Sequence, residues 1–542
     1  MNRVQYLQKL QSEKFDICII GGGASGAGCA LDAALRGFKV ALIEKDDFAS
    51  ATSSKSTKLI HGGVRYLEQA VNNFDLAQLK QVRHGLEERH IVIQNAPFLA
   101  HPLALLTPCN SWVEGCYYAI GLRIYDAFAK GDSLPKSRWI SKKEVLQRTT
   151  GLNPDLHSAV LYYDGQLDDA RYCMLLAKTA AEKGAIMANH LPLLGFEKDA
   201  QGKLLAAQVE DELSGEKFSI QARLFINCTG AHADFVRQQA NPELDRRIIP
   251  SKGVHAVLPL HTLGSTDTAL LIPKTTDGRV IFAIPWEDKL LLGTTDTPYS
   301  SDEEPSLEKD ETEFLIENLN RYLAQPIGLD QVKSGFGGLR PLIASDPGRS
   351  TKALVRDHEV EWDVQSGLLS LLGGKWTTYR LMAADAIDEA CKHLDDAEPP
   401  CLTAAQLLAG AEGYDFQAWK TWPAQTGLDA STCEHLSQKY GSRAQAILAL
   451  LDENNTWRTR LHPDYPFIQA EVIYQIREEM AVKPRDVLAR RLRLEMLDWQ
   501  ATIQATPMVC ELLGLELQWN DEQVQQASIA YQHLIAGFQA KI

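Results

Sequence analysis

Three glycines and one carboxylate near the N-terminus have the spacing of a dinucleotide-binding turn. Gly21, Gly23 and Gly26 fit the pattern G-x-G-x-x-G, and Glu44 follows about 20 positions later. The first glycine permits a tight bend, the second lets the backbone approach a pyrophosphate, and the third lets a helix pack closely on a strand. The helix N-terminus is partly positive and suits the phosphates, whereas the carboxylate suits a ribose. These residues predict a site for NAD or FAD.

The segments around this turn have the pattern of a strand, a helix and a second strand. Ile17 to Ile20 and Val40 to Ile43 are short apolar runs suited to buried parallel strands. Between them, Ala27 to Leu35 is a run of small residues typical of a compact helix. A glycine-rich turn alone is weak evidence, but this context completes the pattern of a dinucleotide site.

A polar segment directly after Glu44 combines hydroxyls, cations and glycines. Residues 50–66 read Ser-Ala-Thr-Ser-Ser-Lys-Ser-Thr-Lys-Leu-Ile-His-Gly-Gly-Val-Arg-Tyr. Hydroxyls and backbone amides hold a diphosphate and the polar edge of a ring; the alternative is a solvated loop. Within this segment Arg65 suits phosphate, because a planar guanidinium makes two parallel hydrogen bonds to it.

Two later segments are predicted to return to the same nucleotide. One is an apolar strand that ends in Thr229 and Gly230. The other is the strand Leu368 to Leu372, followed by the turn Gly373-Gly374-Lys375 and by an amphipathic helix with Thr377 as its N-cap. The dipole of that helix would stabilise an anionic reduced flavin.

Residues 249–339 alternate short strands and turns, which predicts an antiparallel sheet over a pocket. His255 lies in one of these strands, where a histidine is more often a satisfied core residue than a base. Arg340 follows two glycines and precedes a proline, which predicts a rigid turn, and an ordinary surface arginine is the alternative. Earlier in the chain, Asp168 and Asp169 are predicted to cap a helix that runs through Ala180.

The composition excludes several classes of protein. The chain has 542 residues, which predicts two or three domains, and its net charge of -15 disfavours binding to nucleic acid. Its ten cysteines lack metal-ligand spacing, and several lie in apolar runs, which indicates buried thiols in a reducing compartment. No signal peptide, spanning segment or calcium loop is predicted, so no metal is expected and peripheral contact with a membrane stays open.

Two segments have an ambiguous surface. One contains Trp112, Tyr117, Tyr118, Leu122, Tyr125 and Phe128, which suit either a membrane interface or the core, and we expect core packing. The other contains Arg485, Arg490, Arg491 and Arg493 on one predicted helix. That helix would suit anionic lipid or a partner, but we expect a solvated face.

Longer motifs join these segments into one pattern. They are Thr52-Ser53-Ser54, Lys58 to Glu68, Lys252-Gly253-Val254-His255, Gly293-Thr294-Thr295-Asp296, Gly338 to Leu342 and Gly373-Gly374-Lys375, with Ala470-Glu471-Val472 and Arg477 to Ala481 in the tail. Over its whole length the chain resembles the FAD-dependent glycerol-3-phosphate dehydrogenases. Trp376 is a departure, because a smaller aliphatic residue is expected after the glycine-lysine turn.

The resemblance implies an α/β fold, with an FAD-binding Rossmann-like domain, an antiparallel β-sheet substrate domain and a C-terminal all-helical domain. Residues 1–395 are expected to form the FAD-dependent oxidoreductase region and residues 396–542 the helical domain. The FAD-binding parts are expected at 15–75, 220–235 and 366–394, and the substrate-capping parts at 76–219 and 245–345. The expected cofactor-binding residues are Gly21, Gly23, Gly26, Glu44, Thr52, Ser53, Ser54, Lys58, His61, Gly62, Gly63, Thr229, Gly230, Gly373 and Gly374.

The resemblance also implies the reaction, the oxidation of sn-glycerol 3-phosphate to dihydroxyacetone phosphate. FAD takes the hydride and passes electrons to membrane quinone. The residues expected to line the substrate pocket are Arg65, Tyr66, His255, Arg340, Lys375 and Thr377. Three cations among them suit a dianionic phosphate, and His255 is the candidate base.

Two other functions remain open at this point. An oxidase would carry out the same half-reaction and pass electrons to dioxygen, releasing hydrogen peroxide. A flavin-binding RNA-interaction protein is a remote alternative that the acidic charge disfavours. The enzyme is expected in the cytoplasm, peripherally attached to the inner face of the cytoplasmic membrane, and a homodimer is possible.

Overall fold

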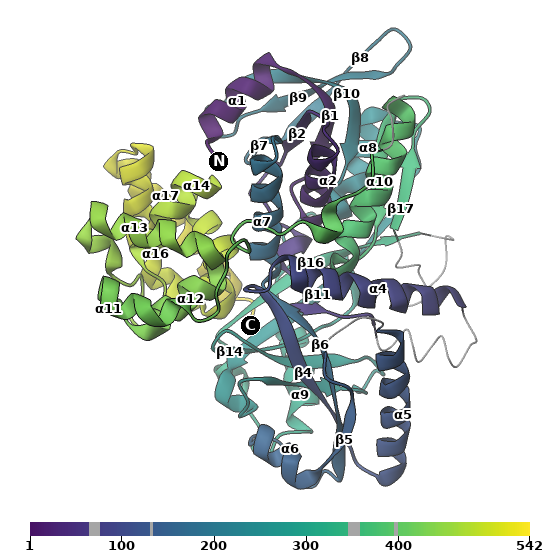
Figure 1. Cartoon of the computed structure of the whole chain (residues 1–542), viewed down its shortest axis with the longest axis vertical. Coiled ribbons are helices and arrows are strands. Elements are labelled where there is room, and N and C mark those ends of the chain that lie inside the picture. The colour runs from purple at the N-terminus through teal and green to yellow at the C-terminus, as the bar shows by residue number, and fades with distance from the viewer. Residues whose placement is uncertain (64–75, 130–133, 345–357, 395–398) are drawn as a thin grey trace.

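The computed structural model describes residues 1–63, 76–129, 134–344, 358–394 and 399–542. Arg65 and Tyr66 therefore lie outside the described residues, as does the predicted boundary at 395. Within the described residues, two β-sheets and a group of C-terminal helices lie side by side, as Figure 1 shows. No described helix is long and apolar enough to cross a bilayer.

The first sheet has eight described strands, in the order β17-β18-β10-β1-β2-β7, with β9 paired to β10 and β8 paired to β9. The strands from β18 to β7 are parallel, and side chains alternate between two buried faces. Helices α2, α7 and α10 cover one face, and α1 and α8 cover the other. The strands are β1 (Lys14–Ile20), β2 (Val40–Ile43), β7 (Ile186–Ala188), β8 (Leu193–Lys198), β9 (Leu204–Glu210), β10 (Lys217–Asn227), β17 (His358–Trp362) and β18 (Leu368–Gly373).

The second sheet has ten described strands and is mostly antiparallel. Its order is β15-β11-β14-β13-β12-β4-β6-β3, with β16 paired to β11 and β5 paired to β6. The strands are β3 (Leu59–Ile60), β4 (Ala100–Cys109), β5 (Arg138–Ser141), β6 (Ser158–Leu167), β11 (Ile248–Pro259), β12 (Thr268–Ile272), β13 (Ile281–Trp286), β14 (Lys289–Gly293), β15 (Thr297–Pro298) and β16 (Ser334–Ile343).

The helices up to residue 394 surround the two sheets. They are α1 (Arg3–Ser12), α2 (Ala24–Leu35), α4 (Leu76–Asn95), α5 (Trp112–Phe128), α6 (Lys142–Arg148), α7 (Asp169–Glu182), α8 (Ala233–Ala240), α9 (Lys309–Asn320) and α10 (Tyr379–Leu394). Asp168 is the N-cap of α7, as predicted, because its carboxylate accepts a hydrogen bond from the Arg171 amide.

The C-terminal region is helical, as predicted, and its apolar core is continuous with that of the second sheet. Its helices are α11 (Trp422–Thr426), α12 (Ala430–Tyr440), α13 (Ala444–Glu453), α14 (Gln469–Glu479), α15 (Leu494–Leu497), α16 (Trp499–Leu517) and α17 (Asp521–Gln539). A π-helical segment, η11, spans Asp486–Arg491. We call α11 to α17 together with η11 the C-terminal helices.

Two assignments near the substrate site are wrong. The segment around Arg340 is not a turn, because β16 pairs with β11 residue by residue through it. Thr377 is not the N-cap of α10, since a short 3-10 helix, Trp376–Thr378, comes first and Lys375 is its N-cap.

The boundary of the capping part also needs correction. Residues 169–210 contain α7 and β7 to β9, which pack on or pair with the first sheet. β7 pairs with β2, β9 with β10 and β8 with β9, so these strands belong to the first sheet, although the sequence analysis assigns 76–219 to the cap.

The expectation that the basic tail segment forms a solvated helix face is also wrong. Arg491 and Arg493 are fully buried, and Arg485 pairs with Glu304 at 2.7 Å and Glu495 at 3.0 Å. Partners such as Asp47, Asp169 and Glu304 come from elements distant in sequence, so the periodicity of one helix did not reveal them. For the other ambiguous segment, core packing is correct for Leu122 and Tyr125 but wrong for Trp112 and Tyr117, which are exposed.

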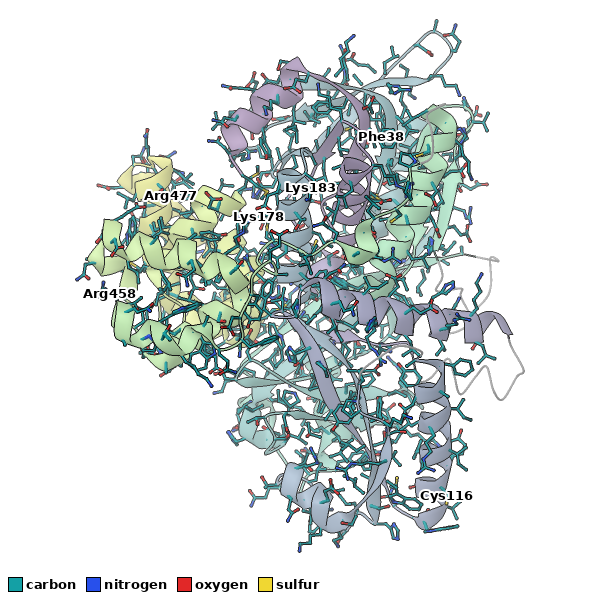
Figure 2. The ribbon with its side chains drawn as sticks, in the orientation of Figure 1. Phe38, Cys116, Lys178, Lys183, Arg458 and Arg477 are labelled. Atoms are coloured by element: carbon teal, nitrogen blue, oxygen red, sulfur yellow. The ribbon has the colours of Figure 1, made fainter. Side chains whose placement is uncertain are left out.

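Buried ion pairs attach the C-terminal helices to α7. Arg171 donates to both carboxylate oxygens of Glu479, at 2.5 and 2.6 Å. Lys178, labelled on α7 in Figure 2, donates to the Tyr474 hydroxyl at 3.0 Å. Arg443 pairs with Glu182 at 2.8 Å across the same interface, but both side chains are exposed.

We predict that Arg171→Met destabilises the protein by about 3–5 kcal/mol, because it leaves the Glu479 carboxylate buried without its main partner. The matched change Arg443→Met should cost only about 0–1 kcal/mol, since its pair is exposed to solvent. Thermal and denaturant unfolding of the two variants would measure the difference. Equal stability of both variants would show that the buried pair does not hold the interface.

Candidate active site

The strand ends of the first sheet gather the predicted nucleotide-binding turns at one edge. Ile20 pairs with Asn227, so β1 and β10 end at the same level, and Asn227 pairs with Ser370 of β18, which continues to Gly373 at the same edge. The glycine turn after β1, Thr229 after β10, and the turn after β18 therefore lie together. Ligands of open α/β sheets bind in the crevice at this carboxyl edge.

The glycine turn leaves no room for side chains at its two closest approaches. Gly21 has a φ of +109°, and a Cβ there would lie 2.7 Å from the Cys228 carbonyl oxygen. A Cβ on Gly26 would lie 1.9 Å from the Gly21 carbonyl oxygen, so α2 starts directly against the turn. The amide of Ala24, in the first turn of α2, donates to Ser53 Oγ at 2.9 Å.

Glu44 is held against the same turn. Its carboxylate accepts hydrogen bonds from the Gly22 amide at 2.6 Å and from the Asp46 amide at 3.0 Å. Burial raises the pKa of Glu44, although these two amides favour the charged form. The Glu44 carboxylate, directly after β2, therefore lies beside the glycine turn. This is the position predicted for a group that binds ribose.

The polar segment after Glu44, which the structure describes over residues 50–63 and which we call the hydroxyl-rich segment, connects the two sheets. Thr52 Oγ1 donates to the Leu339 carbonyl oxygen at 2.6 Å, which ties the segment to β16. The Trp376 indole donates to the Ser53 carbonyl oxygen at 3.2 Å and lies 5.4 Å from the Tyr172 ring. Trp376, the departure noted in the sequence, therefore packs against α7 and supports the segment.

Lys58 turns its ammonium into the protein interior. Its Nζ donates to the Ser54 carbonyl oxygen at 2.9 Å and to Asp169 Oδ2 at 2.8 Å, and the side chain is fully buried. Burial is the main reason that the pKa of Lys58 falls to about 7, although Asp169 opposes the shift. Lys58 therefore fixes the conformation of the segment, while the backbone and hydroxyls of the segment are left for a ligand.

Sequence reasoning treated Asp169 only as a helix cap, yet it organises this segment. Besides Lys58, its carboxylate accepts hydrogen bonds from the Ser56 amide at 2.9 Å and from Arg493 at 3.1 Å. Arg493 also donates to the Ser54 carbonyl oxygen at 2.8 Å. The acidic pair in the first turn of α7 was a visible signal, but its partners are too far along the chain to predict.

The backbone around His61 is fixed by a second buried group. The Gly62 amide donates to the Tyr125 hydroxyl at 2.7 Å, and that hydroxyl donates to Asp164 at 3.0 Å. Asp164 also pairs with Arg89. Desolvation, followed by the charges of Lys375 and Arg89, lowers the pKa of His61 to about 4. Gly63 is the last described residue before the gap and has a φ of +86°.

Arg340 is positioned by the pairing of β11 with β16. A Cβ on Gly253 would lie 2.4 Å from the Arg340 guanidinium, so this glycine makes room for the arginine. The guanidinium donates to Thr294 Oγ1 at 3.1 Å and to the Thr295 carbonyl oxygen at 3.0 Å. Arg340 also pairs with Asp296 at 3.4 Å, but its side chain is 27% exposed, so the guanidinium can still meet a ligand.

His255 lies two residues beyond Gly253, on the same face of β11. A Cβ on Gly293 would lie 2.3 Å from its ring, and the Phe336 ring stacks on it at 4.7 Å. His255 Nε2 is 3.0 Å from Thr57 Oγ1, whereas Nδ1 is buried and has no hydrogen-bond partner among the described residues. Burial, then the charges of Lys58 and Arg340, lowers the pKa of His255 well below its usual value.

The second sheet therefore places a cation and a neutral imidazole next to each other. His255 touches Thr57 of the hydroxyl-rich segment, and Thr52 of the same segment touches β16. Lys375 and Thr377 follow β18 at the edge of the first sheet. The structure thus brings together most of the predicted site residues, from both sheets, while Arg65 and Tyr66 stay outside the described residues.

Among the described residues, one buried group of potential metal ligands includes Asp47, three residues after Glu44. Asp47, His190 and Asp486 offer ligand atoms within 4.8 Å of one another. However, Arg491 donates to Asp47 at 2.7 Å, and His190 Nε2 lies 3.0 Å from Asp486. A guanidinium so close to the carboxylates opposes a cation, and the group is best described as an ion-pair network.

Known protein families match both parts of the chain. A family model described as FAD dependent oxidoreductase matches residues 16–380, and one described as the C-terminal domain of alpha-glycerophosphate oxidase matches residues 401–524. The mitochondrial glycerol-3-phosphate dehydrogenase of Arabidopsis thaliana is 38% identical over 537 residues, which cover 95% of this chain and 85% of that protein. The chain belongs to the FAD-dependent glycerol-3-phosphate dehydrogenase family.

Other members of the family agree with this assignment. A probable mitochondrial glycerol-3-phosphate dehydrogenase of Caenorhabditis elegans is 40% identical over 519 residues, or 94% of this chain and 72% of that protein. The crystal structure of the glycerol-3-phosphate dehydrogenase from Bacillus halodurans, complexed with FAD, has a TM-score of 0.80 and 28% identity, and covers 98% of this chain and 97% of its own. The cofactor of this dehydrogenase family is FAD, and the close approach of α2 to the glycine turn fits its diphosphate.

We predict that Gly26→Ala abolishes the retention of FAD, because the added Cβ would collide with the Gly21 carbonyl oxygen and displace α2 from the turn. The matched control is Gly537→Ala in α17, where a Cβ has no neighbour within 4 Å. Flavin absorbance per mole of purified protein is the measurement. A Gly26→Ala protein that keeps its full flavin content would rule out this turn as the diphosphate site.

Proposed function

We propose that the protein oxidises sn-glycerol 3-phosphate to dihydroxyacetone phosphate and that membrane quinone accepts the electrons. The observation that carries this proposal is the pair formed by Arg340 and His255 on one face of the second sheet, facing the hydroxyl-rich segment. A guanidinium suits the phosphate ester, and a neutral imidazole suits the proton of a neighbouring hydroxyl. Bound FAD supplies a hydride acceptor for the carbon between them.

Arg340 would bind the phosphate of the substrate. Its guanidinium is oriented by Thr294 and Thr295, so it needs little reorganisation to meet an anion. By resemblance, Lys375 and Arg65 would add two cations and Tyr66 and Thr377 two hydroxyls. A dianion with several cationic partners is bound more tightly than glycerol, which lacks the phosphate.

His255 would accept the proton of the C2 hydroxyl. As the C2–H bond breaks and its electron pair leaves with the hydrogen, the C2–O bond becomes a carbonyl and the hydroxyl proton passes to the imidazole. Thr57 fixes the ring by its contact with Nε2, which leaves Nδ1 as the nitrogen without a described partner. The low pKa of His255 keeps the ring neutral and ready to accept a proton at neutral pH.

Quinone is the proposed acceptor, and peripheral attachment to the inner face of the cytoplasmic membrane would give access to it. The alternative acceptor is dioxygen, with release of hydrogen peroxide. Turnover with an added ubiquinone analogue, measured beside peroxide yield under air, separates the two. A stoichiometric peroxide yield without stimulation by quinone would replace the dehydrogenase proposal with an oxidase. Homodimer formation stays a prediction that sedimentation would test.

The reductive half-reaction tests the proposal most directly. We predict that anaerobic sn-glycerol 3-phosphate bleaches the flavin absorbance of the holoenzyme, whereas glycerol and lactate do not. The reason is that Arg340 and its neighbours recognise the phosphate. In Arg340→Ala, KM should rise by about 100-fold while FAD is retained, since a charged hydrogen-bonded partner is worth about 3 kcal/mol.

The matched control is Arg247→Ala, just before β11, because Arg247 pairs with Glu359 and Glu361 instead of facing the pocket. Its KM should stay at the wild-type value. An unchanged KM in Arg340→Ala would remove Arg340 from the phosphate site. Absence of bleaching by the phosphate ester in a flavin-loaded wild type would reject the proposed substrate.

We predict that kcat/KM stays high down to pH values below 6.5, the ordinary pKa of histidine, because the pKa of His255 is lowered and the neutral base persists. His255→Asn should retain FAD but lower kcat by about 100-fold or more, the range usual for loss of a general base. The pH profile of kcat/KM in both proteins is the measurement. If the acidic limb is unchanged in His255→Asn, another group takes the proton.

A further inference from the structure

Helix α5 is apolar on two opposite sides. One side packs into the protein through Leu122 and Tyr125, which are 3% and 1% exposed. The other side presents five large apolar side chains to solvent, with relative exposures between 36% and 70%: Trp112, Val113, Tyr117, Ile120 and Ile124. At 100° per residue these five cover an arc of roughly 140°, so they form one continuous stripe. We call these five residues the α5 stripe.

Helix α5 is held firmly in place, so the stripe is exposed on a helix whose position is fixed. Ser111 caps α5 by accepting a hydrogen bond from the Glu114 amide. A Cβ on Gly115 would lie 2.3 Å from the Trp139 ring, so α5 is pressed closely against β5. Because the opposite side of α5 is already buried, rotation of the helix would not hide the stripe. Such a patch marks an interaction surface.

Exposed cations lie at the same end of the molecule as the stripe, although the chain as a whole is acidic. Arg123, Lys136, Lys142 and Lys143 are exposed, and none of them forms an ion pair with another described residue. Among the described residues from 111 to 148, six lysines and arginines outnumber three carboxylates. Glu114 and Asp126 accept backbone amides, and Glu144 pairs with Arg138 and Arg148. This end of a chain with a net charge of -15 is therefore locally basic.

We propose that the α5 stripe and these four cations form the surface by which the protein docks on an anionic phospholipid bilayer. The inference rests on the proposed transfer of electrons to a membrane quinone and names the face that meets the membrane. Figure 1 places α5, β5 and α6 together at one end of the molecule, away from the C-terminal helices. Cys116, labelled in Figure 2, marks this end.

A lipid surface fits this composition better than a second copy of the chain. Trp and Tyr have apolar rings with polar tips, which suit the boundary between headgroups and acyl chains. An apolar helix face inserts about 5–10 Å into that boundary, and neighbouring cations attract anionic headgroups. In a symmetric dimer through the same face, the two sets of cations would instead repel each other.

Vesicle sedimentation of the holoenzyme tests the docking surface. The wild type should bind vesicles that contain phosphatidylglycerol, and bind pure phosphatidylcholine vesicles at least about tenfold more weakly, because the cations add electrostatic attraction. Ile120→Glu should lower binding to the anionic vesicles by at least about tenfold, because a charge would have to enter the apolar boundary. Lys142→Gln combined with Lys143→Gln should reduce the dependence on anionic lipid.

The matched control is Leu515→Glu, since Leu515 on α16 and Ile120 are equally exposed, at 63% each. It should bind vesicles as the wild type does. All variants should keep their FAD and their activity with a soluble dye acceptor, which also shows that they are folded. If Ile120→Glu and Leu515→Glu bind equally well, the stripe is not the docking surface.

The two proposals fail in different ways. A wild type that reduces the dye with glycerol 3-phosphate but binds no vesicles would overturn the docking surface and leave the reaction intact. A wild type that binds vesicles but does not oxidise the substrate would overturn the proposed reaction and leave the docking surface intact. If Ile120→Glu changes the sedimenting mass of the protein without affecting vesicle binding, a second copy covers the stripe and the inference is wrong.

Discussion

The buried carboxylate of Asp169 is the contact on which the arrangement of the whole molecule depends. It lies at the N-terminus of α7, where the helix dipole favours a negative charge. Lys58 and Arg493 approach it from opposite ends of the sequence, and all three side chains are fully buried. A buried charge is tolerated only when it is paired, so each of these groups requires the other two. This cluster of three charges thereby fixes the first sheet, the hydroxyl-rich segment and the C-terminal helices relative to one another.

The same ion-pair cluster also helps to position the proposed reacting groups, His255 and Arg340. The segment that Asp169 and Arg493 hold contains Thr57, which contacts His255. The pairing of β11 with β16 then sets the position of Arg340 relative to His255, because Gly253 and Gly293 leave space for the two side chains. The distance between the proposed phosphate-binding cation and the proposed base is thus determined by the register of two strands, which is more rigid than any loop.

The parts that the sequence predicted are those governed by local pattern. The strand, turn and helix around Gly21 follow from apolar periodicity and glycine spacing, and Asp168 was recognised as a cap from its position alone. Arg340 was misplaced in a turn because glycine and proline usually end strands, whereas here the partner strand supplies the hydrogen bonds.

The parts that the sequence missed depend on contacts between distant residues. Arg491 and Arg493 looked like a solvated basic face, since their carboxylate partners lie more than 300 residues earlier, at 444 and 324 positions of separation. No sequence pattern around Asp169 showed whether it would only cap a helix or would also form the centre of a buried ion-pair cluster. Periodicity reports which face of an element is apolar, but it does not report which charges that face will meet.

The contact between Arg493 and Ser54 also has a consequence for biosynthesis. The two residues are separated by 439 positions, so the hydroxyl-rich segment emerges from the ribosome long before its guanidinium partner. At typical rates of translation the interval is roughly 20–90 s. During that time the two sheets can form, but the segment after β2 lacks the charge that completes its cluster. The predicted nucleotide-binding segment therefore reaches its final set of contacts only when the polypeptide is nearly complete.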